Sequence, residues 1–409
     1  MSTTLALLKL LLRPTWAAGT NRLSDYERFF SETIAEDESM PTMAFGKGRV
    51  ALWTILRALG LRQNSQVLLP AYTCETVPMA LKYAGVKCLY VDVEPQQFNA
   101  SIERYRGEIT NDTRALICQH TYGIVQPIEE FLTLAEENHV ALIEDCCHLI
   151  DSNFNRKETC LRGHAAFFST HYSKPFSTGQ GGMAVFQDRS LYDDAKAIRD
   201  NFPDGNGRID AISFSLQMLI YTLAVRPATR ALIGSIYRRA QRAGFIRGSV
   251  PVEEYEETIP AQYLARASSC QAILGIEQLQ QWHQNIRHRQ MLTRFYIEQL
   301  SMLGVDVTAL KMGGDDPVLL YAPVLIENKS ELLKLAMRKG VPIACWFDRT
   351  PAHICPNSAY RYDYRPSQCP RAEELISKEI HLLTAPWVTL RQAERAIRLI
   401  KRYAHLVSY

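Results

Sequence analysis

Continuous apolar runs alternate with amphipathic segments through the first half of the chain. Such runs are typical of strands buried on both faces, and the segments between them have the periodicity of helices. The alternation predicts βα units and a mostly parallel sheet with helices on both faces. The expected strands are 67–70, 88–93, 115–120, 141–147, 165–170 and 183–186, and the expected helices are 48–59, 74–84 and 127–138.

The pattern changes after about residue 286. It predicts a helix over "NIRHRQMLTRFYIEQL", a strand over "YAPVLI", a helix over "SELLKLAMRKG" with a serine cap and a glycine stop, a strand over "IACWFD" and a closing helix over "LRQAERAIRLIKRY". We therefore expect an N-terminal arm (1–40), a large α/β domain (41–285) and a small α/β C-terminal domain (286–409).

Composition narrows the functional classes. The chain has 409 residues, 47% of them hydrophobic, and a net charge of +3. This length predicts two domains, and the near-neutral charge argues against bulk nucleic-acid binding. The ten cysteines form no C-x-x-C pair, so no metal site is expected, and their place in apolar runs suits a reducing cytoplasm. Lys9 and Arg13 interrupt the apolar amino terminus, so we expect neither a signal peptide nor a membrane span.

One segment stands apart from this pattern. Between about 205 and 262 the chain carries an insertion whose centre, 214–247, has six arginines and no acid, with Pro227 dividing two expected helices. A basic, apolar helix pair of this kind suits a peripheral contact with the inner membrane surface. It equally suits a lid or dimer arm packed over the active site, and this second interpretation is slightly favoured.

Two residues of opposite charge fall at expected strand ends, where α/β sheets bind their ligands. Asp145 ends "ALIED", and Lys174 follows "AAFFST". A third feature is "AFGKGRVALWTIL" (44–56), a glycine turn that leads into a helix. The amino terminus of such a helix is an anion site. Taken singly, Asp145 is also consistent with a strand cap, Lys174 with a surface lysine in a loop, and the glycines with a plain turn. The aspartate and the lysine together are also consistent with a plain salt bridge.

Together they are the parts that pyridoxal phosphate needs. A lysine forms a Schiff base with the cofactor, an aspartate keeps the ring nitrogen protonated, and a helix amino terminus holds the phosphate. We therefore interpret Lys174 and Asp145 as catalytic candidates.

The chain resembles the DegT/DnrJ/StrS-type sugar aminotransferases, which are fold-type-I pyridoxal phosphate enzymes. The matching stretches include "GKGRVALWTILRALGL", "IEDCCHLID", "FFSTHYSKPFSTGQGGMAVF" and "CQAILGIEQLQ". By resemblance, Lys174 is the Schiff-base lysine and Asp145 the partner of the pyridine nitrogen. The resemblance also implies a cofactor-binding set of Gly48, Arg49, Val50, His148 and Ser169. Where this chain has Arg49 the family usually has threonine, and the guanidinium is expected to add a phosphate contact.

The resemblance implies transfer of an amino group from an amino acid, by analogy glutamate, to a keto-sugar in a cytoplasmic homodimer. Relatives with histidine in place of this lysine perform dehydration, so Lys174 favours transamination. Two alternatives stay open. One is a pyridoxal phosphate enzyme acting on a non-sugar or lipid-linked ketone at the membrane surface, and the other is a non-catalytic regulator with the same fold.

Overall fold

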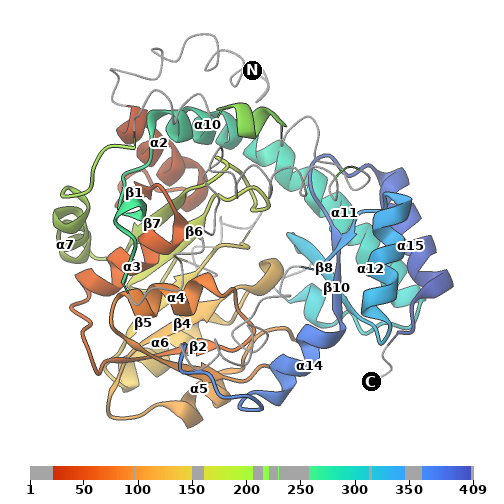
Figure 1. Cartoon of the computed structure of the whole chain (residues 1–409), viewed down its shortest axis with the longest axis horizontal. Helices are drawn as coiled ribbons and strands as arrows, with labels where there is room; N and C mark the ends of the chain where they lie inside the picture. The colour runs from red at the N-terminus through yellow and green to blue at the C-terminus, as the bar shows by residue number, and fades with distance from the viewer. Residues whose placement is uncertain are drawn as a thin grey trace.

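The computed structural model describes residues 22–94, 97–149, 161–205, 215–220, 229, 258–312, 316–345 and 362–406. Two sheets organise these residues (Figure 1). The larger sheet has seven strands in the order β1-β7-β6-β5-β4-β2-β3, and the smaller has three in the order β8-β10-β9.

The large sheet is parallel from β3 to β6 and antiparallel at β7 and β1. The mostly parallel α/β architecture expected from the sequence is thereby confirmed. Its strands are β1 (Thr42–Phe45), β2 (Gln66–Pro70), β3 (Lys87–Val91), β4 (Thr113–Gln119), β5 (Ala141–Asp145), β6 (Ala165–Ser169) and β7 (Gly182–Phe186).

Helices cover both faces of this sheet (Figure 1). Helix α3 lies against β6 and β7, and α6 lies against β4 and β5. The helices of this part are α2 (Arg22–Phe30), α3 (Gly48–Ala58), α4 (Thr76–Tyr83), α5 (Ile102–Glu108), α6 (Ile128–Glu137), α7 (Arg189–Arg199) and α10 (Ser269–Leu279).

Helix α2 falls within the expected N-terminal arm and packs against α10. A Cβ atom built on Gly275 of α10 would lie 2.2 Å from a ring atom of Tyr26, so only glycine allows this contact. Glu27 of α2 accepts the Ala44 N–H at 2.8 Å and pairs with the Arg199 guanidinium. The helix is therefore fastened to both β1 and α7.

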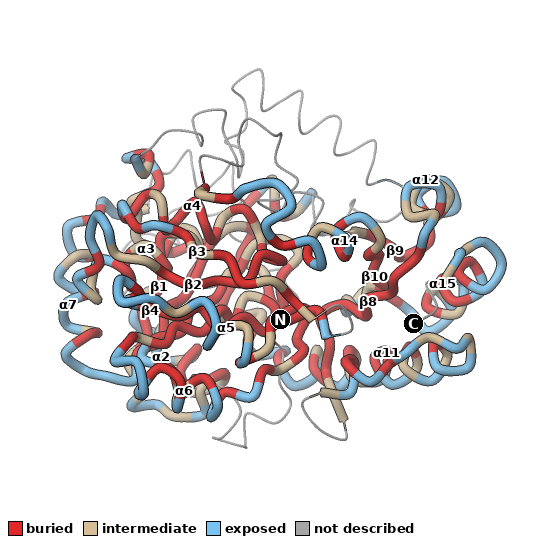
Figure 2. The backbone as a smooth tube through the Cα atoms, turned by 90° about the horizontal axis from the view of Figure 1, so that it is seen from below, coloured by how far each residue is buried: buried red, intermediate tan, exposed pale blue. Residues whose placement is uncertain are grey.

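The small sheet is antiparallel and is built from β8 (Tyr321–Leu325), β9 (Ile343–Ala344) and β10 (Glu379–Leu383). Figure 2 shows its strands buried and the outer sides of its helices exposed. Its helices are α11 (Trp282–Met302), α12 (Lys329–Lys339), α14 (Pro370–Lys378) and α15 (Leu390–Tyr403). Gly340 stops α12 at φ 60°, as its left-handed conformation allows.

The expected elements agree with the observed ones to within a few residues. The strands β1 and β10 and the helices α2, α5, α7, α10 and α14 were not predicted. The expected strand over 343–348 is observed at 343–344, and residues 346–361 lie outside the described part. Of the insertion centre, only residues 215–220 and 229 are described. Residues 215–220 are helical, with Leu216 and Ile220 exposed on one side. None of the described helices is both long and apolar enough to cross a bilayer.

Candidate active site

The carboxyl ends of neighbouring parallel strands bring the two catalytic candidates together. Asp145 is the last residue of β5, opposite Phe167 of β6, and Lys174 follows the end of β6. Both side chains are buried, Asp145 at 5% exposure and Lys174 at 9%. The Lys174 charge reaches Asp145 and helps to stabilise its ionised form. The structure thus brings the predicted pair into one buried site.

The environment of Asp145 is dominated by burial. Burial raises the pKa of the carboxyl, while the Cys147 N–H (3.0 Å from Oδ1) and the charge of Lys174 oppose the rise. The net shift is upward, so the protein compensates the buried anion only in part. A cationic ring nitrogen placed against this carboxylate would supply the missing charge.

Two glycines let the start of α3 approach the end of β6. A Cβ atom on Gly48 would lie 3.1 Å from the Ser169 Cβ, and one on Gly182 would lie 2.4 Å from the Gly48 Cα. The first N–H groups of a helix have no acceptor within the helix, so this cradle favours an anion. Gly48 and Ser169 therefore meet at this cradle, and Arg49 follows Gly48 in the first turn of α3. The Val50 N–H, which the resemblance assigns to the cofactor-binding set, donates to the Lys47 carbonyl at 3.2 Å and is therefore already hydrogen-bonded in this structure.

Cationic side chains surround the same place. Burial and, after it, the charges of Lys174, Lys47 and Arg49 together lower the pKa of His171 to about 3. Lys47 Nζ donates to Gln180 Oε1 at 2.9 Å, and its charge lies 4.5 Å from the Tyr263 ring centroid. Three cations beside a neutral imidazole create a positive potential that suits a doubly charged phosphate.

Arg49 itself lies at the edge of this group. Its guanidinium is 5.4 Å from the Tyr263 ring centroid and donates to the Met79 sulfur at 3.3 Å. Its charge still reaches His171. In this conformation Arg49 therefore adds to the positive potential from the side of α4, and the predicted bidentate phosphate contact stays a proposal.

His148 is held as a neutral hydrogen-bond donor. Its ring stacks on Tyr122 at 5.8 Å with an interplanar angle of 3°. The Tyr122 N–H donates to Nδ1 at 3.2 Å, which places the ring proton on Nε2. Burial, Lys174 and His381 hold the pKa of His148 well below its usual value. The ring proton on Nε2 makes His148 a hydrogen-bond donor, the role that the resemblance implies beside a cofactor oxygen.

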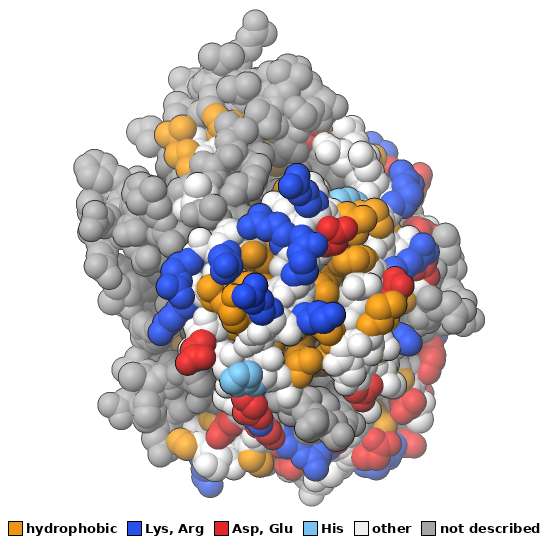
Figure 3. Space-filling view, turned by 90° about the vertical axis from the view of Figure 1, so that its right-hand side faces the viewer, with side chains coloured by type: hydrophobic (Ala, Val, Ile, Leu, Met, Phe, Trp, Pro, Cys, Tyr) orange, Lys and Arg blue, Asp and Glu red, His pale blue; other side chains and the backbone are white. Residues whose placement is uncertain are grey.

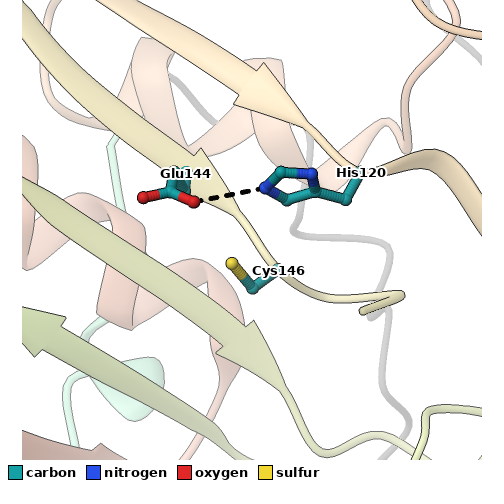
Figure 4. A group of neighbouring side chains, drawn as sticks. All are labelled: His120, Glu144 and Cys146. Atoms are coloured by element: carbon teal, nitrogen blue, oxygen red, sulfur yellow. Dashed lines mark hydrogen bonds and ion pairs between the residues drawn. The ribbon is translucent and has the colours of Figure 1, made fainter. Parts of the chain in front are cut away.

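A buried group that the sequence analysis missed supports this arrangement (Figure 4). Glu144 accepts the N–H groups of Leu161, Arg162 and Gly163 at 2.7 to 3.0 Å. The Gln126 N–H occupies His120 Nδ1, so His120 Nε2–H donates to Glu144 at 3.3 Å.

Glu144, His120 and Cys146 lie close enough together to suggest a metal site. The Glu144 oxygens and His120 Nδ1, which would have to bind the metal ion, instead accept these hydrogen bonds. Their effect is to fasten the chain that enters β6 onto β5, next to Asp145. An acid inside the apolar run "ALIED" was the available signal for this network, because a parallel strand buried on both faces has no solvated side for Glu144.

The family model of the DegT/DnrJ/EryC1/StrS aminotransferase family matches residues 2–208 and 238–401. The chain therefore belongs to this family, as the sequence analysis predicted. The GDP-perosamine synthase of Escherichia coli O157:H7 is 31% identical over 183 residues, which are 44% of this chain and 50% of that protein. The alignment thus spans about half the length of this curated relative.

Solved structures share the fold over nearly the whole chain. NtdA from Bacillus subtilis, solved with bound cofactor PMP, has a TM-score of 0.70 and 19% identity, covering 98% of this chain and 82% of that one. The E. coli GDP-4-keto-6-deoxy-D-mannose-3-dehydratase, with bound hydrated PLP, has a TM-score of 0.71 and 18% identity, covering 97% and 96%. Because this fold serves both an aminotransferase family and a dehydratase, fold alone does not choose the reaction.

Neutralising Asp145 tests whether this carboxylate serves chemistry at the expense of stability. We expect Asp145→Asn to raise the thermal midpoint of the cofactor-free protein at pH 7 by roughly 1–4 °C, because it removes a buried, partly compensated charge. The gain should vanish below about pH 4, where aspartate is protonated in both the folded and the unfolded state. Scanning calorimetry across pH measures this.

The control is Asp188→Asn at the exposed amino-terminal cap of α7, where the Ser190 N–H and hydroxyl lower the carboxyl pKa. This variant should give no gain in stability. Turnover with cofactor should fall ~10²-fold or more in Asp145→Asn, the loss expected when an essential electrostatic partner is removed. A less stable Asp145→Asn protein with normal turnover would contradict the assignment.

Proposed function

We propose that this protein is a pyridoxal phosphate-dependent aminotransferase that transfers an amino group from an amino acid, by resemblance glutamate, to a keto-sugar. The observation that carries the proposal is the burial of Lys174 and Asp145 at adjacent strand ends, beside a cation-lined helix start. Lys174 supports transamination over the dehydration for which the fold is also used. The role in amino-sugar, polysaccharide or antibiotic biosynthesis follows from the resemblance.

Pyridoxal phosphate, when bound, supplies a ring that accepts electrons from the substrate carbon. Lys174 Nζ would hold the cofactor covalently and then carry the proton to and from that carbon. Asp145 would keep the ring nitrogen protonated, and His148 Nε2–H would donate to a ring oxygen. Gly48, Arg49, Val50 and Ser169 would surround the phosphate at the α3 terminus, with Lys47 contributing charge.

A nucleotide-linked sugar is the favoured acceptor. The support for this proposal is the relative named as a GDP-perosamine synthase, which is 31% identical over 44% of this chain. Both the acceptor and the amino-acid donor are therefore proposed by chemical class.

Covalent labelling tests the central role. Protein incubated with pyridoxal phosphate and reduced with borohydride should carry the cofactor on Lys174, located by peptide mass spectrometry. Lys174→Ala should lose the label and essentially all turnover with glutamate. Lys47→Met should still be labelled at saturating cofactor, with weaker affinity, because Lys47 offers charge only. Wild-type protein that takes no label would favour the regulator alternative.

We further propose a homodimer, since by resemblance two chains complete each site. The exposed apolar pair Leu216 and Ile220 offers surface that a partner chain could bury. Analytical ultracentrifugation should show a dimer at micromolar concentration. An active monomer would contradict the proposal.

A membrane-surface enzyme acting on a lipid-linked ketone is the second candidate, and the small domain supplies the specific observation. Helices α12 and α15 carry nine Lys and Arg residues against two Glu, in a chain whose net charge is only +3. Figure 3 shows Lys and Arg side chains gathered on this side of the molecule, with hydrophobic side chains between them. Met337, Leu390 and Tyr403 are exposed on these helices. Clustered cations with interleaved apolar side chains suit an anionic lipid surface.

Vesicle flotation decides between the two settings. Phosphatidylcholine vesicles containing phosphatidylserine should bind the protein, vesicles without it should not, and salt should weaken the binding. The triple variant Lys334→Gln, Arg338→Gln, Arg391→Gln should bind about five-fold more weakly per charge. The control, Arg57→Gln, Arg62→Gln, Lys87→Gln, removes three exposed charges from the large domain and should bind as wild type. If both triple variants lose the same amount of vesicle binding, or if the wild-type protein does not float with vesicles, the membrane-surface proposal fails and the nucleotide-sugar enzyme remains.

A further inference from the structure

Three buried side chains of the small sheet face the strand ends of the large sheet. Tyr321 begins β8, and Glu379 and His381 lie on β10. Their exposures are 5%, 0% and 1%. Glu379 and His381 are two residues apart on one strand and therefore point to the same face. The candidate active site is thus walled by polar side chains of the second sheet.

Tyr321 reaches the peptide that precedes the reactive lysine. Its hydroxyl donates to the Ser173 carbonyl at 2.8 Å, and the next residue is Lys174. The Lys174 N–H in turn donates to the His171 carbonyl at 3.0 Å. The Ser173–Lys174 peptide is therefore held on its carbonyl side by the small domain and on the far side by its own loop. A fixed peptide plane sets the direction in which the lysine side chain leaves the backbone.

A buried acid–imidazole pair holds Tyr321 in turn. The Tyr321 ring stacks on His381 with centroids 4.2 Å apart and an interplanar angle of 21°. His381 Nδ1 donates to Glu379 Oε1 at 2.9 Å. The Glu379 charge raises the pKa values of Tyr72 and Tyr122, second to their own burial. A fully buried acid–imidazole pair is costly to desolvate, which favours a role in orientation over one in stability.

The same strand is also fixed to the loop that holds His148. The N–H of Leu320, next to Tyr321, donates to the Tyr122 carbonyl at 2.8 Å. Tyr122 has a left-handed backbone at φ 59°, unusual for a bulky residue, and it contacts His148 through its ring and its N–H. The start of β8 therefore fastens the loops after β4 and β6 at once.

We propose that Tyr321 is a positioning residue for Lys174. The position of the small domain then helps to determine where the reactive amine lies. The His381–Glu379 pair fixes the orientation of the Tyr321 ring, and the Tyr321 hydroxyl fixes the orientation of the Ser173–Lys174 peptide. The peptide plane in turn determines where the lysine Nζ lies. The inference rests on the proposed role of Lys174. It adds that a hydroxyl on the second sheet, which contacts the lysine loop through the Ser173 carbonyl, controls the reaction rate.

Tyr321→Phe tests this inference against a matched control. Tyr296→Phe removes another buried tyrosine hydroxyl of the same domain, which donates to a carbonyl at 3.1 Å, but that carbonyl belongs to Leu383. Both variants lose one hydroxyl-to-carbonyl bond, so both should lose a similar, small part of the stability. Only Tyr321→Phe should lower kcat, by ~10–100-fold with KM for the ketone nearly unchanged, since small misplacements of a reacting group are costly.

The second readout needs neither cofactor nor turnover. Hydrogen exchange of the cofactor-free protein should show amides of 170–178 exchanging about ten-fold faster in Tyr321→Phe and as wild type in Tyr296→Phe. Equal exchange in the two variants, or equal kcat values, would overturn the inference. If wild-type protein takes no borohydride label at Lys174, the proposed function fails on its own. The exchange comparison still decides whether Tyr321 orders the lysine loop.

Discussion

The structure depends on a charge imbalance that is buried at the ends of parallel strands. Asp145 is buried where water cannot solvate it, and the charges of Lys174, Lys47 and Arg49 reach the neutral, half-buried His171. Folding gains nothing from this arrangement, because an isolated buried ion is costly and like charges repel. A ligand that carries a ring cation at one end and a phosphate dianion at the other would neutralise both places. The site is therefore complementary in charge to something the polypeptide does not contain.

The surrounding fold keeps these charged groups in place. Glycines at 48 and 182 bring the α3 terminus within contact distance of β6, where side chains would collide. Glu144 fastens the entry of β6 to β5 with three backbone hydrogen bonds. The small sheet contacts the loop after β6 through the Tyr321 hydroxyl, which donates to the Ser173 carbonyl. Each device fixes a strand end relative to its neighbour, and strand ends carry the charges.

Much of this arrangement could be predicted from the sequence, because short stretches of the chain carry the signal. The strands β2 to β7 are continuous apolar runs, and Asp145 and Lys174 are polar residues at their ends, so the pattern alone places the predicted pair at one edge. Strand β1 was not predicted because four residues, "TMAF", give too short a signal and the partner, β7, lies far along the chain. Strand β10 carries Glu379 and His381 on its buried face, which breaks the apolar signature of a strand.

The contacts between the sheets are of a different kind. Tyr321 and Ser173 are far apart in sequence, and each alone is an ordinary residue in an ordinary run. No periodicity connects them, because their meeting depends on how two separately formed sheets dock. The same holds for Tyr122, whose left-handed backbone at φ 59° could not be inferred from "HTYGIV" without the neighbouring β8 start that holds it. Sequence therefore identifies the chemical groups in this protein, and the docking of the two sheets determines how those groups are aimed.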